Sequence, residues 1–565
     1  MKHQRTSGPK NYAGPLSVHT SIPVSSLNVR SPIQTFLKNS ASYRTPDAAS
    51  STVVGVNVAS SYVSKEARRA VFEVAQEQVP DADAPLVSGQ LPSWLRGALL
   101  LNGCGDYRGM QHLFDGYACL TRIHLDGSTG RVTAGQRFLA SDAYGSFRRT
   151  GRMKYREFQT PLTADGPMGR AMAVLDNMAA LMSKGRAFTD NASVSLVPLP
   201  DNRLLALSEA RTASYIVNPT TLDTVQQVEY GDNIPGDLTT AHPKQAPDGS
   251  IVNFSRSLPF GGFHVFRQDP ISLQRKQIAF IRDRNPLAPC WVHDMAITTS
   301  HLVVLEQPLF FNMGSLVLGY SRPFAFMDWN PEAGTRVHVI ALDGSGVVTH
   351  TAPPLFTFHF VNAFERPCGS GTGAEICVDF CVYDDPEVIN DLSLDRLNAF
   401  PGKDISPSFL RRLSIPLLNA SGRPVGPSSL AAPAPLLKDE STYGNFAEFP
   451  AFNPRFRGKP YRYAYGTAAV RPTNMGNALA RHDLELGTST LWHEPGALPA
   501  EPIFVPRPGA ASEDDGVLLA TVALADGRSA LVVLDGATLW EHARVAIPFA
   551  VPYRFHGAFV AGGRS

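Results

Sequence analysis

The chain lacks any apolar run of about 18 residues, the length that a helix needs to cross a bilayer. It also lacks an excess of either charge sign, since 51 Lys and Arg against 50 Asp and Glu leave a net charge of +1. Nucleic-acid-binding proteins normally carry a basic excess. The sequence therefore predicts no membrane-spanning helix and no nucleic-acid partner, and nothing in it indicates an obligate protein partner.

Cysteine is scarce, with six residues in a chain of 565. None of them forms a CxxC pair, so neither a disulfide framework nor a cysteine-ligated zinc site is expected. We interpret the cysteines as reduced and mostly buried thiols. They are Cys104, Cys119, Cys290, Cys368, Cys377 and Cys381.

Short β-rich runs separated by turn signals dominate the chain after about residue 60. Apolar residues make up 43% of the sequence, enough to bury a large core, and 46 Gly and 45 Pro favour many short elements. Runs such as 301–306, 516–523 and 529–534, with turns such as Asp526-Gly527, indicate antiparallel meanders. Residues 60–565 divide into roughly seven units of ~70 residues, which predicts an all-β, seven-bladed propeller.

The N-terminal segment differs from the rest. Residues 1–46 contain six Lys or Arg, twelve Ser or Thr and no Asp or Glu. This composition is typical of a plastid transit peptide, and a disordered tail is the alternative for residues 1–50. A short helix is expected next, with Ser64 as its N-cap.

One segment, Pro167 to Met182, has apolar residues at helical spacing. Such a face usually packs in a core, but in a β-rich protein a Met-rich helix on an insertion can instead lie on a membrane. We predict a membrane or tunnel entrance there, with a second apolar edge nearby. The first patch is Met168, Met172, Leu175 and Met182, and the second edge is Leu309, Phe310, Phe311, Leu316 and Val317.

Four histidines lie where strands are expected to end in loops: His242, His293, His359 and His556. Their separations of 51, 66 and 197 residues place them on different blades, whose inner ends meet at the axis of a propeller. Alone, each would be interpreted as a structural residue. Together they predict an axial metal site of neutral imidazoles, which suits Fe, Cu, Zn or Ni.

The motifs around these histidines resemble those of the carotenoid cleavage oxygenases. The similarity covers about residues 85–562, and within the family it is greatest to the carlactone synthases. The family motifs are 89–97 (GQLPSWLRG), 112–116 (HLFDG), 241–243 (AHP), 291–294 (WVHD), 358–362 (FHFVN), 501–506 (EPIFVP) and 555–557 (FHG). Those shared with the carlactone synthases include 141–144 (SDAY), 155–158 (YREF), 461–465 (YRYAY) and 505–509 (VPRPG).

The resemblance implies a seven-bladed propeller, with helical and loop insertions forming a cap over one axial Fe(2+) per chain. It implies His242, His293, His359 and His556 as ligands, with a carboxylate behind three of them that fixes the ring orientation. By motif these carboxylates are Glu209, Glu448 and Glu501, whereas Glu365 is interpreted as structural, and no further catalytic side chain is assigned. A tunnel lined by aromatic residues is expected, with Phe358, Phe360, Phe364, Phe449 and Phe555 near the ligands.

The activity implied is cleavage of a conjugated double bond of an apocarotenoid or carotenoid by dioxygen. The closest resemblance implies 10′-apo-β-carotenal as substrate, giving carlactone or 13-apo-β-carotenone, in the plastid stroma or on its membrane surface. Cleavage of intact carotenoids or of a stilbenoid-type alkene is the first alternative. A propeller that binds ligands without catalysis is the second.

Overall fold

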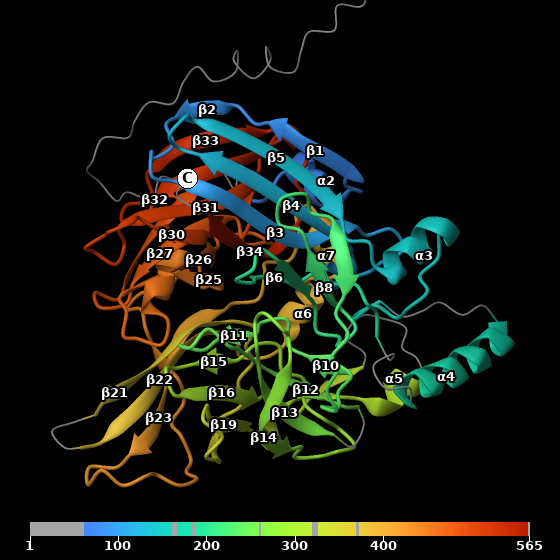
Figure 1. Ribbon diagram of the computed structural model, residues 1–565, viewed down its shortest axis with the longest axis vertical. Coiled ribbons are helices and arrows are strands. Elements are labelled where there is room, and N and C mark those ends of the chain that lie inside the picture. Colours follow the sequence, from blue (N-terminus) through green and yellow to red (C-terminus); the bar gives the residue numbers. More distant parts are fainter. Residues whose placement is uncertain are drawn as a thin grey trace, which may run out of the picture. The chain divides into compact units, whose positions relative to one another are not determined.

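The computed structural model describes residues 61–160, 166–182, 188–258, 261–318, 326–368 and 372–562. The predicted transit peptide or tail at residues 1–50 lies outside these ranges. Figure 1 labels most of the helices and strands of the described part.

The hairpin formed by β31 (Gly516–Ala523) and β32 (Ser529–Asp535) shows how the sequence dictates the strands. Every residue of β31 is buried. An uninterrupted apolar run is what a strand covered on both faces requires. The two strands pair antiparallel, and the Asp526-Gly527 turn joins them. Gly527 has a φ of +83°, a conformation that a side chain would disfavour, which is why glycine ends this turn. The predicted boundaries of both strands agree with the structure to within one residue.

In the described part of the chain, seven antiparallel sheets of four to six strands form the blades of a β-propeller, which confirms the predicted fold. The first blade contains β1 (Gln78–Asp83), β5 (Arg131–Phe138), β4 (Tyr117–Asp126), β3 (Arg96–Asp106) and β34 (Arg554–Ala561). The second contains β6 (Ser195–Pro198), β7 (Leu204–Leu207), β8 (Ser214–Val217) and β9 (Thr224–Gln227). The third contains β10 (Leu238–Thr239), β11 (Lys244–Gln245), β12 (Ile251–Arg256), β13 (Gly262–Gln268) and β14 (Arg275–Arg282).

The later blades follow in chain order. The fourth contains β15 (Ala296–Ile297), β16 (His301–Glu306), β19 (Thr335–Ala341) and β20 (Val347–Ala352). The fifth contains β21 (Phe360–Pro367), β22 (Ala374–Val382), β23 (Phe409–Leu418) and β24 (Ala434–Pro435), and the sixth β25 (Glu448–Phe452), β26 (Tyr463–Ala468), β27 (Ala478–Asp483) and β28 (Thr488–His493). The seventh contains β29 (Leu498–Pro499), β30 (Ile503–Pro506), β31, β32, β33 (Glu541–Ile547) and β2 (Leu86–Gly89).

The ring is closed twice by strands from opposite ends of the chain. The C-terminal strand β34 pairs with β3 in the first blade, and the early strand β2 pairs with β33 in the seventh. At Gly97 of β3, a Cβ atom would lie 2.3 Å from the carbonyl oxygen of Val560, so this pairing requires glycine there. The closure covers edges that would otherwise expose unpaired backbone groups.

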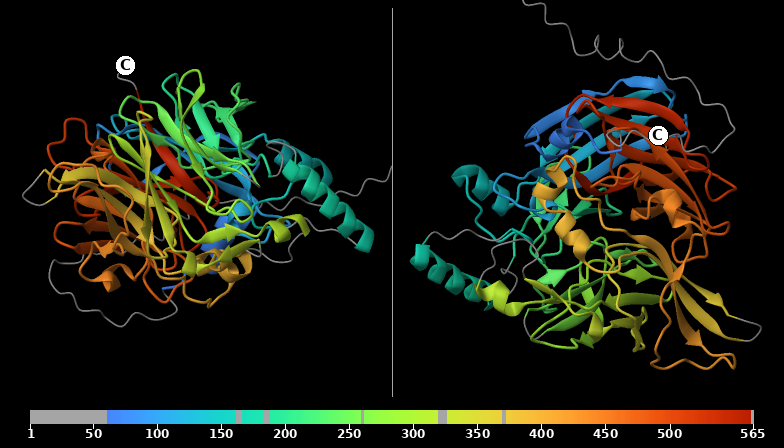
Figure 2. Two further views of the ribbon diagram at one scale, coloured as in Figure 1. Left: turned by 90° about the horizontal axis from the view of Figure 1, so that it is seen from below. Right: turned by 180° about the vertical axis from the view of Figure 1, so that it is seen from behind.

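Short helices lie outside the sheets: α2 (Lys65–Phe72), α3 (Asp142–Thr150), α4 (Gly166–Met182), α5 (Met313–Leu318), α6 (Glu387–Asp391) and α7 (Leu394–Asn398). The expected cap is present at α2, where the Ser64 side chain accepts a hydrogen bond from the Ala67 amide. None of the helices in the described ranges is long and apolar enough to span a membrane. Figure 2 shows α4 projecting from the side of the sheets beside α5.

The helix predicted over residues 167–182 is α4, and its apolar side chains are exposed rather than packed in a core. Met168 is 82% exposed, Leu175 60% and Met172 54%, whereas the side chain of Met182 lies outside the described part. Exposed apolar patches of this kind are typical of interaction surfaces.

The second predicted edge is wrong. Leu309, Phe310, Phe311 and Leu316 are buried, and Val317 is partly buried. The cause is a partner strand that the sequence pattern did not reveal: β17 (Leu309–Phe311) pairs with β18 (Met327–Trp329) and packs with Trp291 in one apolar cluster.

Candidate metal centre

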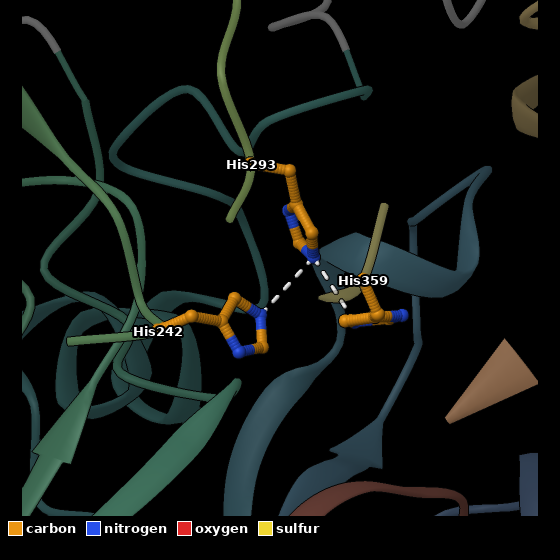
Figure 3. A group of neighbouring side chains, drawn as sticks. All are labelled: His242, His293 and His359. Atoms are coloured by element: carbon orange, nitrogen blue, oxygen red, sulfur yellow. Dashed lines mark hydrogen bonds between the residues drawn. The ribbon is translucent and has the colours of Figure 1, made fainter. Parts of the chain in front are cut away.

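The four predicted histidines come from four different blades and meet at one point. Three of them lie just before an innermost strand. His242 lies two residues before β11, His293 lies three residues before β15, and His359 directly precedes β21. Their ligand nitrogens all lie within 4.8 Å of one another. Figure 3 shows the three side chains pointing toward one another. His556, on β34, joins them, with its ring centroid 4.5 Å from that of His242 and 4.9 Å from that of His359.

The histidine rings face one another through Nε2. The Nε2 atoms of His242 and His293 are 3.1 Å apart, and those of His293 and His359 are 3.3 Å apart. Burial, followed by the neighbouring histidines, lowers the pKa of His242 and of His359 well below its usual value. Both rings are therefore neutral, the form in which imidazole binds metals.

Three of the rings are oriented by carboxylates at their other nitrogen. The Nδ1 atoms of His293 and His359 lie 2.5 Å from Glu209 and Glu448, respectively, and His556 Nδ1 lies 2.8 Å from Glu501. These are the three carboxylates that the motifs indicated. An ionised carboxylate only accepts hydrogen bonds, so Nδ1 carries the proton and Nε2 presents a lone pair to the centre.

The carboxylates are themselves held in place. Trp291 Nε1 donates to Glu209 at 2.7 Å, and the Gly557 amide donates to Glu501 at 2.9 Å. Burial raises the pKa of Glu448 to about 7, while the Phe449 amide donates to the carboxylate at 3.0 Å. Phe449 itself has a φ of +48°, a strained conformation for a non-glycine residue, and its ring packs against His359.

The donor set fits a divalent transition metal. Lone pairs on neutral nitrogens about 3 Å apart repel one another, and a cation between them removes this repulsion. Imidazole ligands whose second nitrogen donates to a carboxylate are the usual arrangement at protein metal centres. Each of the seven blades supplies one side chain of this assembly, in the order His556, Glu209, His242, His293, His359, Glu448 and Glu501.

The centre opens into an apolar cavity. His293, His359 and His556 form part of its wall. Most of the remaining wall is aromatic or aliphatic and includes Phe114, Phe158, Trp291, Phe358, Phe449 and Phe555. Residues of the segment that carries α6 and α7, among them Val388, Leu392 and Leu397, also line it and form part of the predicted cap.

The expected aromatic residues divide into two groups. Phe358, Phe449 and Phe555 line the cavity, whereas Phe360 and Phe364 are buried and are not among the lining residues. Strand alternation explains Phe360, because it directly follows His359 and points to the opposite face. Phe114 and Phe158 were not predicted, although both lie in motifs that carried the resemblance, 112–116 and 155–158.

Glu365 is separate from the centre. It contacts His301 Nδ1 at 3.0 Å and accepts a hydrogen bond from Thr298 at 2.5 Å. Its partners are thus outside the four-histidine cluster, in agreement with the structural role inferred from the sequence.

The comparisons with known proteins agree with this geometry. The retinal pigment epithelial membrane protein family model matches residues 71–561. The chain is 36% identical over 489 residues to carotenoid cleavage dioxygenase 8 homolog A, chloroplastic, of Oryza sativa subsp. japonica, covering 85% of each chain. It is 34% identical to carotenoid cleavage dioxygenase 8, chloroplastic, of Arabidopsis thaliana, covering 84% of this chain and 83% of the relative.

A solved structure is similar as well. Cobalt-substituted apocarotenoid oxygenase (ACO) of Synechocystis superposes with a TM-score of 0.71 at 25% identity, covering 89% of this chain and 100% of that one. The fold and the site define a β-propeller oxygenase. The chain belongs to the carotenoid cleavage dioxygenase family and is a dioxygenase of carotenoid or apocarotenoid substrates.

Proposed function

We propose that the protein is an iron(II)-dependent dioxygenase that cleaves 10′-apo-β-carotenal to carlactone or 13-apo-β-carotenone. The observation that carries this proposal is the apolar cavity that ends on three of the four histidines. The relatives named carotenoid cleavage dioxygenase 8 support the shortened substrate.

The four histidines would hold the iron through Nε2, and the carboxylates keep Nδ1 protonated and the rings fixed. Iron(II) bound by neutral imidazoles supplies redox chemistry with dioxygen. In the cleavage to 13-apo-β-carotenone, one carbon–carbon double bond breaks and each of its two carbons gains one oxygen atom from dioxygen. A related apocarotenoid oxygenase has been prepared with cobalt, which supports a divalent-metal site.

The chain's own contribution is to position the polyene and exclude water. Aromatic side chains such as Phe114, Phe358 and Phe449 present flat apolar surfaces that a conjugated chain can pack against. Holding one double bond beside the centre selects which bond is cleaved, since proximity and orientation lower the barrier.

The test combines metal analysis with product analysis. Purified protein should contain about one iron per chain, and His293→Ala and His556→Ala should lose iron and activity together. The enzyme should be offered 9-cis and all-trans 10′-apo-β-carotenal beside intact β-carotene. Rapid cleavage of β-carotene without turnover of either aldehyde would overturn the substrate proposal. Full activity of metal-free His293→Ala would overturn the proposal that the enzyme depends on iron.

We also propose that α4 rests on a membrane and delivers the substrate to the cavity. Its exposed Met168, Met172 and Leu175 support this, because exposed apolar residues on a helix favour the acyl boundary of a bilayer. A plastid location is supported by the acid-free N-terminal composition and by the chloroplastic relatives.

A further inference from the structure

A buried carboxylate that is not part of the cavity wall joins three of the four histidine segments. Asp294 is 4% exposed and is absent from the cavity lining. Its Oδ1 accepts from the Met295 amide at 2.7 Å and lies 2.7 Å from Lys244 Nζ. Its Oδ2 accepts from the Phe360 amide at 3.1 Å.

Each partner is adjacent in sequence to a different histidine. Lys244 lies two residues after His242, Asp294 directly follows His293, and Phe360 directly follows His359. These segments lead into the innermost strands of the third, fourth and fifth blades, which are separate sheets with no shared ladder of hydrogen bonds. The spacing between the three rings therefore depends on contacts between sheets.

The polar contacts around Thr240 strengthen the same junction. The Thr240 hydroxyl donates to the backbone carbonyl of His293 and accepts from the His242 amide, the latter at 3.0 Å. This residue fixes two of the three segments, whereas Asp294 contacts all three. His556 is held differently, because Glu501 binds both its ring and the following Gly557 amide.

A carboxylate is costly to bury and is retained only where charged or hydrogen-bonding partners compensate it. The side chain of Asp294 is 3% exposed, and a cation and two backbone amides surround it. Removing it would leave the Lys244 ammonium and both amides without their acceptor. The His242 and His293 segments would then be joined only through Thr240, and the backbone of the His359 segment would lose its bond to the His293 segment.

We propose that Asp294 is a positioning residue that sets the spacing of His242, His293 and His359 for the metal. The inference rests on the proposed function, since it assumes that these histidines bind a divalent metal. Lys244 completes the clamp by tying the His242 segment to Asp294. Neither residue touches the substrate cavity, so the clamp acts on the metal through the histidines.

The test measures metal retention and coordination, not turnover alone. Wild-type protein, Asp294→Ala, Asp294→Asn and Lys244→Met are loaded with cobalt(II), and the release of the ion to a chelator is followed beside its visible spectrum. Mutation of a side chain that holds a metal ligand in place typically weakens metal affinity by about 10–100-fold. Asp294→Ala should release cobalt about 10–100-fold faster with an altered spectrum, and Lys244→Met should have a smaller effect of the same kind.

Asp379→Asn is the matched control. Asp379 is fully buried in the fifth blade, where Arg412 binds both of its oxygens at 2.7 Å, so its loss should lower stability without changing the cobalt spectrum. An unchanged release rate and spectrum in folded Asp294→Ala would overturn the clamp. If that variant does not fold, the same unchanged result for Lys244→Met overturns it. Wild-type protein that binds no metal would instead overturn the proposed function.

Discussion

At the scale of single residues, the carboxylates behind three of the histidines orient the rings for the proposed metal. Glu501→Gln and Glu209→Gln keep the size of the side chain but remove the charge that fixes Nδ1–H toward it. Each should weaken metal affinity by about 10–100-fold. Glu365→Gln is the control, because Glu365 contacts His301 instead of the cluster. Competition with a chelator measures the three affinities, and equal values for all three would contradict the assignment.

A second residue-scale prediction concerns acid stability. Burial lowers the pKa of His482 to about 3, far below the value of about 6.5 in an unfolded chain. Between these values the unfolded state binds a proton that the native state does not, so stability falls as the pH drops from 6.5 toward 3. One such group gives a slope of about 1.4 kcal/mol per pH unit.

The variant His482→Gln removes this group, so the slope of stability against pH should fall by about 1.4 kcal/mol per pH unit. Thermal unfolding of the wild type and the variant at several pH values between 4 and 7 measures the difference. Parallel pH profiles for the two proteins would show that His482 takes no part in the acid response.

The sequence predicted the residues of the centre better than their contacts. Each histidine and each of the three glutamates lies in a short motif, so its identity was readable. The hydrogen bond between Glu209 and His293 spans 84 residues and two blades, and no local pattern encodes it. Asp294 belongs to the motif 291–294, yet its contacts with the other two histidine segments depend on where β11 and β21 lie.

At the scale of elements, α4 and β17 show why apolar runs alone do not predict exposure. Both segments were predicted as surface, and only α4 is exposed. The difference is the neighbour: β17 has β18 as a partner strand, whereas Met168, Met172 and Leu175 of α4 are more than half exposed. The boundaries of strands such as β31 and β32 were readable because an Asp-Gly turn separates their apolar runs.

Charging the exposed face of α4 should therefore weaken membrane binding without unfolding the protein. Leu175→Glu and Met172→Glu should release the protein from liposomes while leaving its melting temperature within a few degrees. Leu287→Glu is the matched control, since Leu287 is 64% exposed and Leu175 60%. Flotation with liposomes measures the binding, and equal binding of all three variants would contradict a role for α4.

The N-terminal helix α2 gives a limit for truncation. Val63, Ala67 and Val71 are buried, and the Asn477 side chain donates to the Ser61 carbonyl. Deletion of residues 1–50 should leave stability and catalysis unchanged, whereas deletion through Phe72 should lower the melting temperature because these contacts are lost. Melting curves and turnover of both deletions provide the check.

At the scale of the whole molecule, a metal bound at the centre would link four blades. The histidines belong to the first, third, fourth and fifth sheets. A ligand that binds only the native state stabilises it by about 2.7 kcal/mol at a concentration 100 times its Kd.

Chelation should consequently lower the melting temperature of the entire protein, and re-addition of iron(II) should restore it. Calorimetry of the metal-free and reloaded forms measures this shift. In His293→Ala, which lacks one ligand, the shift should be much smaller. A full-sized shift in that variant would show that the stabilising ion binds elsewhere.

The double closure of the ring also has a consequence for the timing of synthesis. A ribosome produces β34 after all the other strands that the structure describes, and this strand both completes the first blade and carries His556. Until it emerges, the first blade lacks its innermost strand and the histidine cluster lacks a member. A chain that terminates before β34 therefore cannot form the full histidine cluster. Only a chain translated through β34 can hold the proposed metal with all four histidines.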